Sequence, residues 1–324
     1  MSRPILEVEA VAKHFPGKGG RLLRAVENVS LALAPGETLG IVGESGSGKS
    51  TLGRLMLGLH KPTAGRVRFE GVDLASLSPA ALRRLRRHMQ PVFQDPYASL
   101  DPRFTVGASI AEPLAIHRIG DAAQRRRRVA ELLDIVGLEP DAARRYPHEF
   151  SGGQRQRIGI ARAIAPEPKL IVADEPVSAL DVSIQSQILN LLIDLKSRLS
   201  LSYVFISHDL AVVEHISDRV AVMYLGQVVE LAETAALYKR ALHPYTRALI
   251  SAIPEPEPAR RRERIILSGD APNPEEPPPG CPFHPRCPEV MPRCRTDPPP
   301  RAELGSRASP HLAVCHLHGD PGGR

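Results

Sequence analysis

The sequence predicts an α/β fold in which helices cover both faces of a largely parallel sheet. Three apolar runs without polar alternation, at residues 37–43, 169–174 and 202–207, are typical of strands buried on both faces. After Asp181, a candidate helix N-cap, leucine and isoleucine recur at three- and four-residue spacing as far as Leu199. This spacing predicts an amphipathic helix that packs one stripe on such a sheet.

A glycine-rich loop follows the first of these strands. The segment GESGSGKST leads directly from the strand into an apolar, helix-compatible segment. Its glycines let successive backbone N–H groups point at one anion, and the helix start adds partial positive charge. We expect Lys49 to bridge the β- and γ-phosphates of a nucleoside triphosphate and the Ser50 hydroxyl to bind Mg²⁺. The expected nucleotide contacts in this loop are Gly43, Ser45, Gly46, Gly48, Lys49, Ser50 and Thr51.

Two carboxylates end the second apolar run. Asp174 and Glu175 close the segment KLIVADE, so both side chains should emerge at the carboxyl edge of the sheet, where open α/β folds bind ligands. Asp174 suits an outer contact to Mg²⁺. Glu175 suits the base that orients and polarises an attacking water. The pair therefore favours hydrolysis over mere nucleotide sensing.

Composition divides the chain near residue 240. Residues 1–240 alternate β-branched runs with amphipathic stretches, whereas residues 241–324 hold 18 of the 32 prolines and are expected to form an irregular, turn-rich extension. The extension also contains all four cysteines of the chain, Cys281, Cys287, Cys294 and Cys315. Because structural disulfides are rare in the cytoplasm, clustered cysteines there predict a metal or redox site.

Hydropathy and charge limit the location and the partners that the sequence predicts. No run approaches the roughly 18–20 apolar residues that cross a bilayer, and the start lacks a secretory signal, so we expect a cytoplasmic protein. The net charge of +6 comes from separate basic runs, at 82–88, 125–128 and 260–264. We expect mostly solvated helix faces there, with lipid headgroups or acidic partners as the alternative. Aromatic residues make up only 4% of the chain, so a nucleic-acid partner is not expected.

Five motifs in order resemble one family. The segment FSGGQRQR, taken alone, is a glycine turn that opens a helix. Together with the phosphate loop, VFQDP around Gln94, SALD ending at Asp181 and VFISHD with His208, it resembles the ATP-binding subunit of an ABC (ATP-binding cassette) transporter. The resemblance covers residues 4–240. It implies a P-loop NTPase cassette with a RecA-like core, an antiparallel β subdomain and a helical subdomain at about 95–165.

The resemblance assigns roles to individual residues. Phe15, in KHFPG, is similar to the aromatic residue that stacks on adenine. Gln94 resembles the residue that contacts Mg²⁺ and the attacking water, and His208 resembles the switch histidine at the γ-phosphate. With Glu175 these two form the expected catalytic group, and Asp181 joins the expected nucleotide contacts. The signature residues resemble those that cap ATP on the opposing subunit: Ser151, Gly152, Gly153 and Gln154.

The resemblance implies a composite site, because a phosphate loop holds nucleotide from one side only. A second helix N-terminus, preceded by serine and glycines, supplies donors from the other side. The expected assembly is a head-to-tail dimer around two ATP molecules, with a copy of this chain or a paralogue as partner. Two transmembrane permease subunits and, indirectly, an extracytoplasmic solute-binding protein would complete the transporter. The expected location is peripheral, at the cytoplasmic face of the inner membrane.

Further segments resemble the ATP-binding subunits of dipeptide and oligopeptide importers: DPYASLDPRFTVG, HPYTRALISAIP and GCPFHPRCP. This implies import of peptides, with nickel, sugars or glutathione as alternative cargo. The main rival class is a soluble ABC ATPase that acts on nucleic acid or ribosomes. The segment between Gln94 and Ser151 is too short for the long insertions of DNA-repair members. A P-loop kinase would have no use for the signature or for His208.

Cysteines of this kind are expected, from the resemblance to importer subunits, to hold a [4Fe–4S] cluster. The spacing C-x5-C-x6-C-x20-C lacks the short C-x2-4-C pairs usual for structural zinc. Zinc and unliganded thiols remain the alternatives, and His284 and His316 are possible substitute ligands. We expect the prolines between the cysteines to hold the loop open so that the thiols converge. The site would then stabilise the fold of an extension whose many prolines leave too few backbone N–H groups for regular hydrogen bonding.

Overall fold

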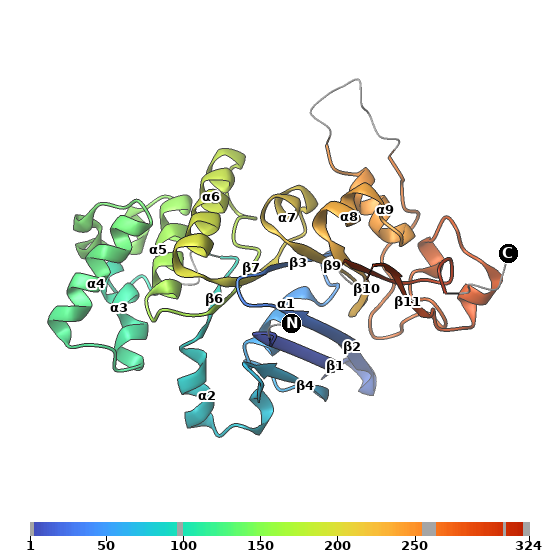
Figure 1. The fold of residues 1–324 in the computed structure, drawn as a ribbon, viewed down its shortest axis with the longest axis horizontal. Helices are drawn as coiled ribbons and strands as arrows, with labels where there is room; N and C mark the ends of the chain where they lie inside the picture. The colour runs from blue at the N-terminus through green and yellow to red at the C-terminus, as the bar shows by residue number, and fades with distance from the viewer. Residues whose placement is uncertain (1–2, 96–99, 255–263, 307–308, 320–324) are drawn as a thin grey trace.

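The computed structural model describes residues 3–95, 100–254, 264–306 and 309–319. Its centre is an eight-stranded sheet with the strand order β11-β12-β10-β9-β3-β8-β7-β6 (Figure 1). The last five strands of this order are β9 (Arg219–Tyr224), β3 (Thr38–Val42), β8 (Ser202–Ile206), β7 (Leu170–Asp174) and β6 (Met89–Val92). The three strands predicted from apolar runs are therefore confirmed.

The middle of this sheet is parallel and buried on both faces. β3 pairs in parallel with β8 on one side and with β9 on the other, and β7 lies between β8 and β6. Every residue of β3 and of β8 is buried. This explains why these segments carry continuous apolar side chains instead of alternating ones. The parallel direction also brings the ends of β3, β7 and β8 to one edge of the sheet.

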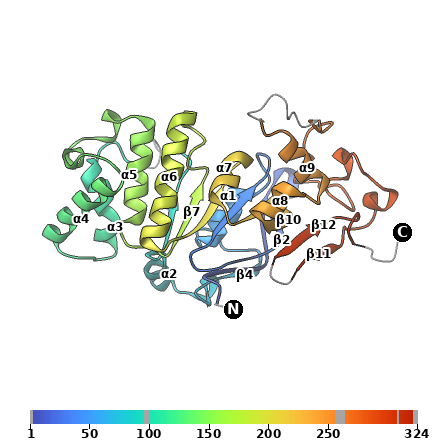
Figure 2. The same ribbon diagram turned by 45° about the horizontal axis from the view of Figure 1, so that its top comes forward.

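A second, antiparallel sheet packs below the first. Its strand order is β2-β1-β4-β5, and helix α1 lies between the two sheets (Figures 1 and 2). The bounds are β1 Leu6–Pro16, β2 Leu22–Leu33, α1 Lys49–Met56, β4 Ala64–Phe69 and β5 Val72–Asp73. Leu52, Leu55 and Met56 of α1 are almost fully buried in the core that the two sheets share. This is the antiparallel β subdomain that the resemblance to ABC cassettes implies.

Helices form an arm beyond β6 at one end of the central sheet (Figure 1). They are α3 (Val106–Ile116), α4 (Ala122–Ile135) and α5 (Gly152–Ile164), while α2 (Pro79–Arg86) lies closer to the antiparallel sheet. Each helix of the arm begins at a side chain that accepts a backbone N–H bond: Thr105, Asp121 or Ser151. The arm falls within the range at which the helical subdomain was expected.

The predicted amphipathic helix is confirmed as α6 (Val182–Leu199), with α7 (Leu210–Ile216) next to it over the sheet. The buried stripe of α6 consists of Ile188, Leu189, Leu192 and Leu195. It is rotated relative to the predicted stripe, because Leu199 is 38% exposed and Ile184 is only partly buried. Asp181 occupies the N-cap position, but its side chain makes no capping hydrogen bond.

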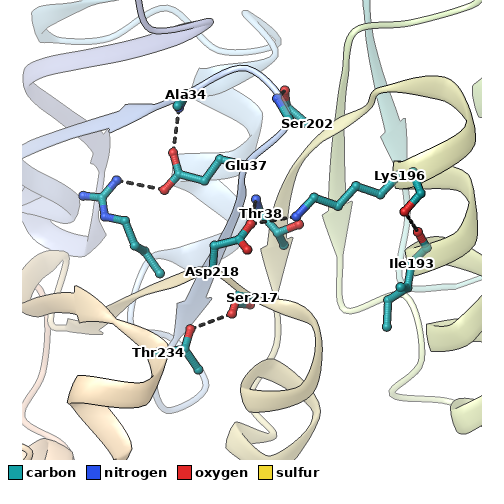
Figure 3. A network of polar contacts seen from close by, with 12 residues as sticks. Ala34, Glu37, Thr38, Ile193, Lys196, Ser202, Ser217, Asp218 and Thr234 are labelled. Atoms are coloured by element: carbon teal, nitrogen blue, oxygen red, sulfur yellow. Dashed lines mark hydrogen bonds and ion pairs between the residues drawn. The ribbon is translucent and has the colours of Figure 1, made fainter. Parts of the chain in front are cut away.

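A polar network fixes α6 to the amino-terminal ends of β3 and β9 (Figure 3). The Asp218 carboxylate accepts bonds from the Thr38 backbone N–H and the Lys196 ammonium, both at 2.7 Å. Beside it, Arg219 donates to Glu37 at 3.0 Å. These contacts lie at the opposite edge of the sheet from the glycine-rich loop. They therefore hold the scaffold and leave the carboxyl edge free for chemistry.

The extension is turn-rich, but it also adds regular structure to the central sheet. β12 pairs antiparallel with β10, with Leu312 opposite Leu231, and β11 pairs antiparallel with the other edge of β12 (Figure 2). The elements concerned are β10 (Gln227–Glu233), α8 (Thr234–Lys239), α9 (Pro244–Ser251), β11 (Arg301–Gly305) and β12 (Pro310–Val314). Two short 3-10 turns between them cover His284–Arg286 and Pro292–Arg295. One sheet thus spans the two sides of the compositional boundary.

A buried carboxylate joins the extension to β10. Glu230 is fully buried and accepts hydrogen bonds from the backbone N–H groups of Leu242 and His243, at 2.7 and 2.9 Å, and pairs with His311 Nε2 at 2.6 Å. Burial opposes ionisation of this carboxyl, but the His311 ring and the backbone donors outweigh it and lower the pKa of Glu230.

The described helices include none that is both long and apolar enough to cross a membrane.

Candidate active site

The glycine-rich loop connects β3 to α1 at the carboxyl edge of the central sheet. Gly48, at the N-cap of α1, has φ of +100°, and a Cβ there would lie 2.1 Å from the Ala25 carbonyl oxygen. Only glycine fits this position. A Cβ on Gly46, by contrast, would meet nothing within 4 Å. The loop is therefore packed against the protein on one side and open on the side where the first N–H groups of α1 would meet a phosphate.

Lys49 is the first residue of α1, and its side chain folds back onto the glycine-rich loop. Its ammonium donates to the carbonyl oxygens of Gly43 and Glu44 at 2.7 and 2.9 Å, and the residue is only 4% exposed. Burial lowers the pKa of Lys49, whereas the nearby carboxylates Glu175 and Asp174 act in the opposite direction. Phosphate oxygens would offer this buried cation a charged acceptor in place of neutral carbonyls.

Ser50 and Asp174 form the next part of the site. The Ser50 hydroxyl donates to Asp174 Oδ1 at 2.8 Å, which joins the start of α1 to the end of β7. Burial raises the pKa of Asp174, and the charge of Glu175 adds to the effect. A hydroxyl and a carboxylate with an unfavourably buried charge fit Mg²⁺, which prefers oxygen ligands and would stabilise the ionised carboxylate.

The three predicted catalytic residues meet at one carboxylate oxygen. Gln94 Nε2 donates to Glu175 Oε2 at 2.9 Å, and His208 Nδ1 lies 3.2 Å from the same oxygen. Glu175 has φ of +48°, a left-handed conformation that is uncommon for a side chain with Cβ. Its backbone N–H donates to the Ile206 carbonyl oxygen at 2.9 Å, which fixes the side chain just beyond β7.

These parts enclose one cavity of about 650 Å³. This volume is within the range of small-molecule sites. The cavity is lined by Ser45, Gly46, Gly48, Lys49, Ser50 and Thr51 from the loop, by Gln94, Glu175 and His208, and by Leu23, Ala25 and Pro274. Pro274 belongs to the extension and was not anticipated from the sequence. The glycine cradle, the buried lysine and the Ser50–Asp174 pair together fit a magnesium-bound nucleoside triphosphate.

Phe15 does not line this cavity. Its ring lies edge-on to His60, with 5.6 Å between ring centroids, and Lys13 Nζ is 5.0 Å from its centroid. Leu23, the partner of Phe15 across the β1–β2 pair, does line the cavity. The adenine-stacking role of Phe15 therefore stays a prediction.

The signature residues also lie away from the cavity, at the start of α5. Ser151 and Gln154 cap each other, because Ser151 N–H donates to Gln154 Oε1 at 3.0 Å and Gln154 N–H donates to Ser151 Oγ at 3.4 Å. A Cβ on Gly153 would lie 2.5 Å from Ile184 Cγ2, so this glycine allows α5 to approach α6. Neither Gly152 nor Asp181 lines the cavity. Within one chain, the signature and the phosphate loop are separate.

The four cysteines lie in the extension as free thiols. The Cys281 backbone N–H donates to the Cys294 carbonyl oxygen at 2.9 Å, and Cys294 Sγ accepts from Met291 N–H at 3.4 Å. Burial, with a contribution from the neighbouring thiols, raises the pKa of Cys287 and of Cys315 to about 11. Among the residues that the structure describes, no group of three or more His, Cys, Asp or Glu is arranged to hold a metal ion.

Comparisons with known proteins agree with the motifs. The family model for ABC transporters matches residues 26–178, and the model for the C-terminal region of oligopeptide/dipeptide transporters matches residues 229–294. The oligopeptide transport ATP-binding protein AppF of Bacillus subtilis is 53% identical over 323 residues, which cover 97% of each chain. The chain belongs to the ABC transporter family. A putative peptide import ATP-binding protein of Brucella ovis is 56% identical over 301 residues, 93% of this chain and 95% of its own.

Solved structures confirm the cassette fold. A dimeric ATP-binding cassette in a post-hydrolysis state, bound to ADP and Pi, is 33% identical with a TM-score of 0.65, and the match covers 71% of this chain and 98% of that one. The family and fold class predicted from the sequence are therefore both confirmed. As a member of this family, the ABC subunit is an ATPase.

Proposed function

We propose that this ABC subunit hydrolyses ATP to power the import of peptides through a membrane permease. The observation that carries the proposal is the cavity that Lys49, Ser50 and Glu175 line together, with Asp174 hydrogen-bonded to Ser50 behind it. Peptide as the cargo is supported by relatives named for peptide import that align over nearly the whole chain, the extension included. Nickel, sugars or glutathione find no comparable support.

The loop residues would hold the triphosphate. The first N–H groups of α1 would donate to phosphate oxygens, and Lys49 would exchange its two carbonyl contacts for oxygens of the β- and γ-phosphates. Mg²⁺, held by Ser50 and Asp174 with Gln94 nearby, would neutralise charge on the phosphates. Ser45 and Thr51 complete the wall of the cavity on the same side.

Glu175 would act as the general base. Because Gln94 and His208 both contact Oε2, we assign the proton of the attacking water to Oε1. Gln94 would orient the carboxylate and sense Mg²⁺, and His208 would contact the γ-phosphate. The left-handed backbone conformation of Glu175 places its carboxylate at the end of β7.

The signature of a second subunit would complete the site. Ser151, Gly152, Gly153 and Gln154 open α5, and the start of this helix can present N–H groups to phosphates bound on another chain. We therefore propose a head-to-tail dimer with a copy or a paralogue. Two permease subunits would hold this dimer at the cytoplasmic face of the membrane, with an extracytoplasmic solute-binding protein delivering cargo. Phe15 would stack on the adenine ring, and Asp181 would contact the nucleotide.

The four thiols would hold a [4Fe–4S] cluster, or zinc as the alternative. The proposal is supported by the resemblance to importer subunits and by the placing of all four cysteines in one region, with three of them buried. It has no support from a preformed ligand arrangement in the described residues.

Reconstituted transport tests the function. The complete transporter in proteoliposomes should accumulate labelled di- and oligopeptides only with ATP on the side of this subunit. Unlabelled nickel, sugar or glutathione should not compete. Lys49→Ala should abolish uptake. Peptide-independent accumulation of one of these competitors would overturn the cargo assignment, and ATP-independent uptake would overturn the transport function.

A further inference from the structure

Glu44, the second residue of the phosphate loop, is held from three sides. Its backbone N–H donates to the Tyr245 hydroxyl at 2.9 Å, and its carbonyl oxygen accepts from Lys49 at 2.9 Å. Its carboxylate accepts two bonds from Arg286, with Nη1–Oε2 at 2.7 Å and Nη2–Oε1 at 3.0 Å. Two of these three partners lie beyond residue 240. The extension therefore contacts the phosphate loop directly, across 242 positions of sequence.

The Arg286–Glu44 pair differs from an ordinary surface ion pair. The two parallel bonds have the fork-to-fork geometry in which arginine binds carboxylates most strongly. The Arg286 side chain is only 9% exposed, and Glu44 is 32% exposed. Loss of the guanidinium would therefore leave a partly buried carboxylate without its partner, which costs more than breaking an exposed pair.

Aromatic packing fixes the position of Arg286. Phe283, three residues earlier, is 1% exposed and packs on Tyr224 and Tyr245, with ring centroids 5.2 and 5.4 Å apart. Tyr224 and Tyr245 themselves lie 4.7 Å apart. These rings come from β9 and from two parts of the extension, α9 and the segment before Arg286. The short turn that ends at Arg286 is thus anchored in the core beside the phosphate loop.

We propose that Arg286 is a positioning residue of the nucleotide site, which acts through Glu44. The inference rests on the proposed role of the loop in binding phosphate. A carboxylate within a loop that receives a polyanion would repel it, and Arg286 neutralises this charge. The same two bonds hold the start of the loop, so that its N–H groups stay directed at the phosphates. The extension thereby sets the affinity of the site for MgATP.

The test measures the Kd of MgATP by titration calorimetry on the full chain. Arg286→Ala should raise the Kd by on the order of tenfold, within the range typical of coupled sites. The matched control is Arg247→Ala, because Arg247 pairs with Glu289 at 2.6 Å and joins two parts of the extension, with no hydrogen bond to the phosphate loop in the part of the chain that the structure describes. This control should bind MgATP with the wild-type Kd. The thermal midpoint of each variant without nucleotide identifies any that is unfolded.

Rescue separates positioning from general stability. In the Arg286→Ala background, Glu44→Gln removes the unpaired carboxylate, so the double variant should recover part of the lost affinity. Arg286→Lys keeps the charge without the fork, and it should fold and show an intermediate Kd. A purely structural role of Arg286 predicts no recovery in the double variant.

The outcomes are distinct. Wild-type Kd in both Arg286→Ala and Arg286→Lys would overturn the inference, as would an equal loss in Arg247→Ala or a double variant no better than Arg286→Ala. These results leave the phosphate site itself intact. A wild-type chain that binds MgATP no more tightly than Lys49→Ala would instead overturn the proposed function, and the inference with it.

Discussion

Replacement of Glu175 by glutamine isolates the proposed base. The amide oxygen of glutamine can take the place of Oε2, so it can keep the bond from Gln94 at 2.9 Å. The amide nitrogen that replaces Oε1 cannot accept a proton from water. General base catalysis contributes about 10²–10⁴ in rate, so hydrolysis should fall by that factor, or about 3–5 kcal/mol in barrier height. MgATP binding should remain, because the loop contacts do not change.

The assay is single-turnover hydrolysis by the purified transporter, with MgATP affinity measured on the same preparation. We expect Glu175→Gln to retain bound ATP in the transporter, and the isolated Glu175→Gln subunit with its partner to accumulate the closed dimer, visible by size-exclusion chromatography. Glu175→Asp serves as the control, since it keeps a carboxylate but shortens its reach, and it should be slowed less. Hydrolysis by Glu175→Gln at the wild-type rate would refute the reasoning.

Three other substitutions give separate expectations. Lys49→Ala removes a charge-assisted contact to phosphate and should weaken MgATP binding by about 10–100-fold in calorimetry; an unchanged Kd would contradict the phosphate site. Anaerobically purified protein should contain about four iron and four sulfide per chain, and Cys287→Ser should lose both, whereas one zinc per colourless chain would favour the alternative. Because the pKa of Glu230 is lowered in the fold, its contribution to stability is present above the unfolded pKa of about 4.3 and is lost as pH falls through the folded value. In urea denaturation, Glu230→Gln should therefore be less stable than wild type by about 1–3 kcal/mol at pH 7, with a smaller difference in acid; an equal difference at both pH values would contradict this origin.

The central part of the fold could be predicted because its signals are local. β3, β7 and β8 are continuous apolar runs, which only strands with two covered faces require. The edge strand β12 gave no such signal, because its sequence PHLAV is short and its pairing with β10 depends on residues far away in the chain. The exact stripe of α6 also depends on its neighbours, since α5 packs against Ile184.

The candidate site likewise contains residues that local motifs predict and residues that only the tertiary structure brings there. The phosphate loop and Glu175 follow from local motifs at strand ends, and the structure brings them into one cavity. Pro274 and Arg286 could not be found from the sequence, because neither stands in a pattern that relates it to the phosphate loop. Their contribution depends on how a proline-rich segment returns to the core. Tertiary structure alone makes them neighbours of Glu44 and of the cavity.

The pairing of β12 with β10 has a consequence for dissecting the molecule. A chain cut near residue 240 would present the backbone N–H and C=O groups of β10 as an open edge, a template for intermolecular pairing. The same cut would remove Leu242, His243 and His311, and with them the hydrogen bonds to a carboxylate that is fully buried in the intact chain. The isolated cassette should therefore tend to aggregate, and a shortened chain that stays in solution would need to retain the final hairpin or carry a replacement strand. The two regions that sequence composition separates share one sheet and the hydrogen bonds of one buried carboxylate.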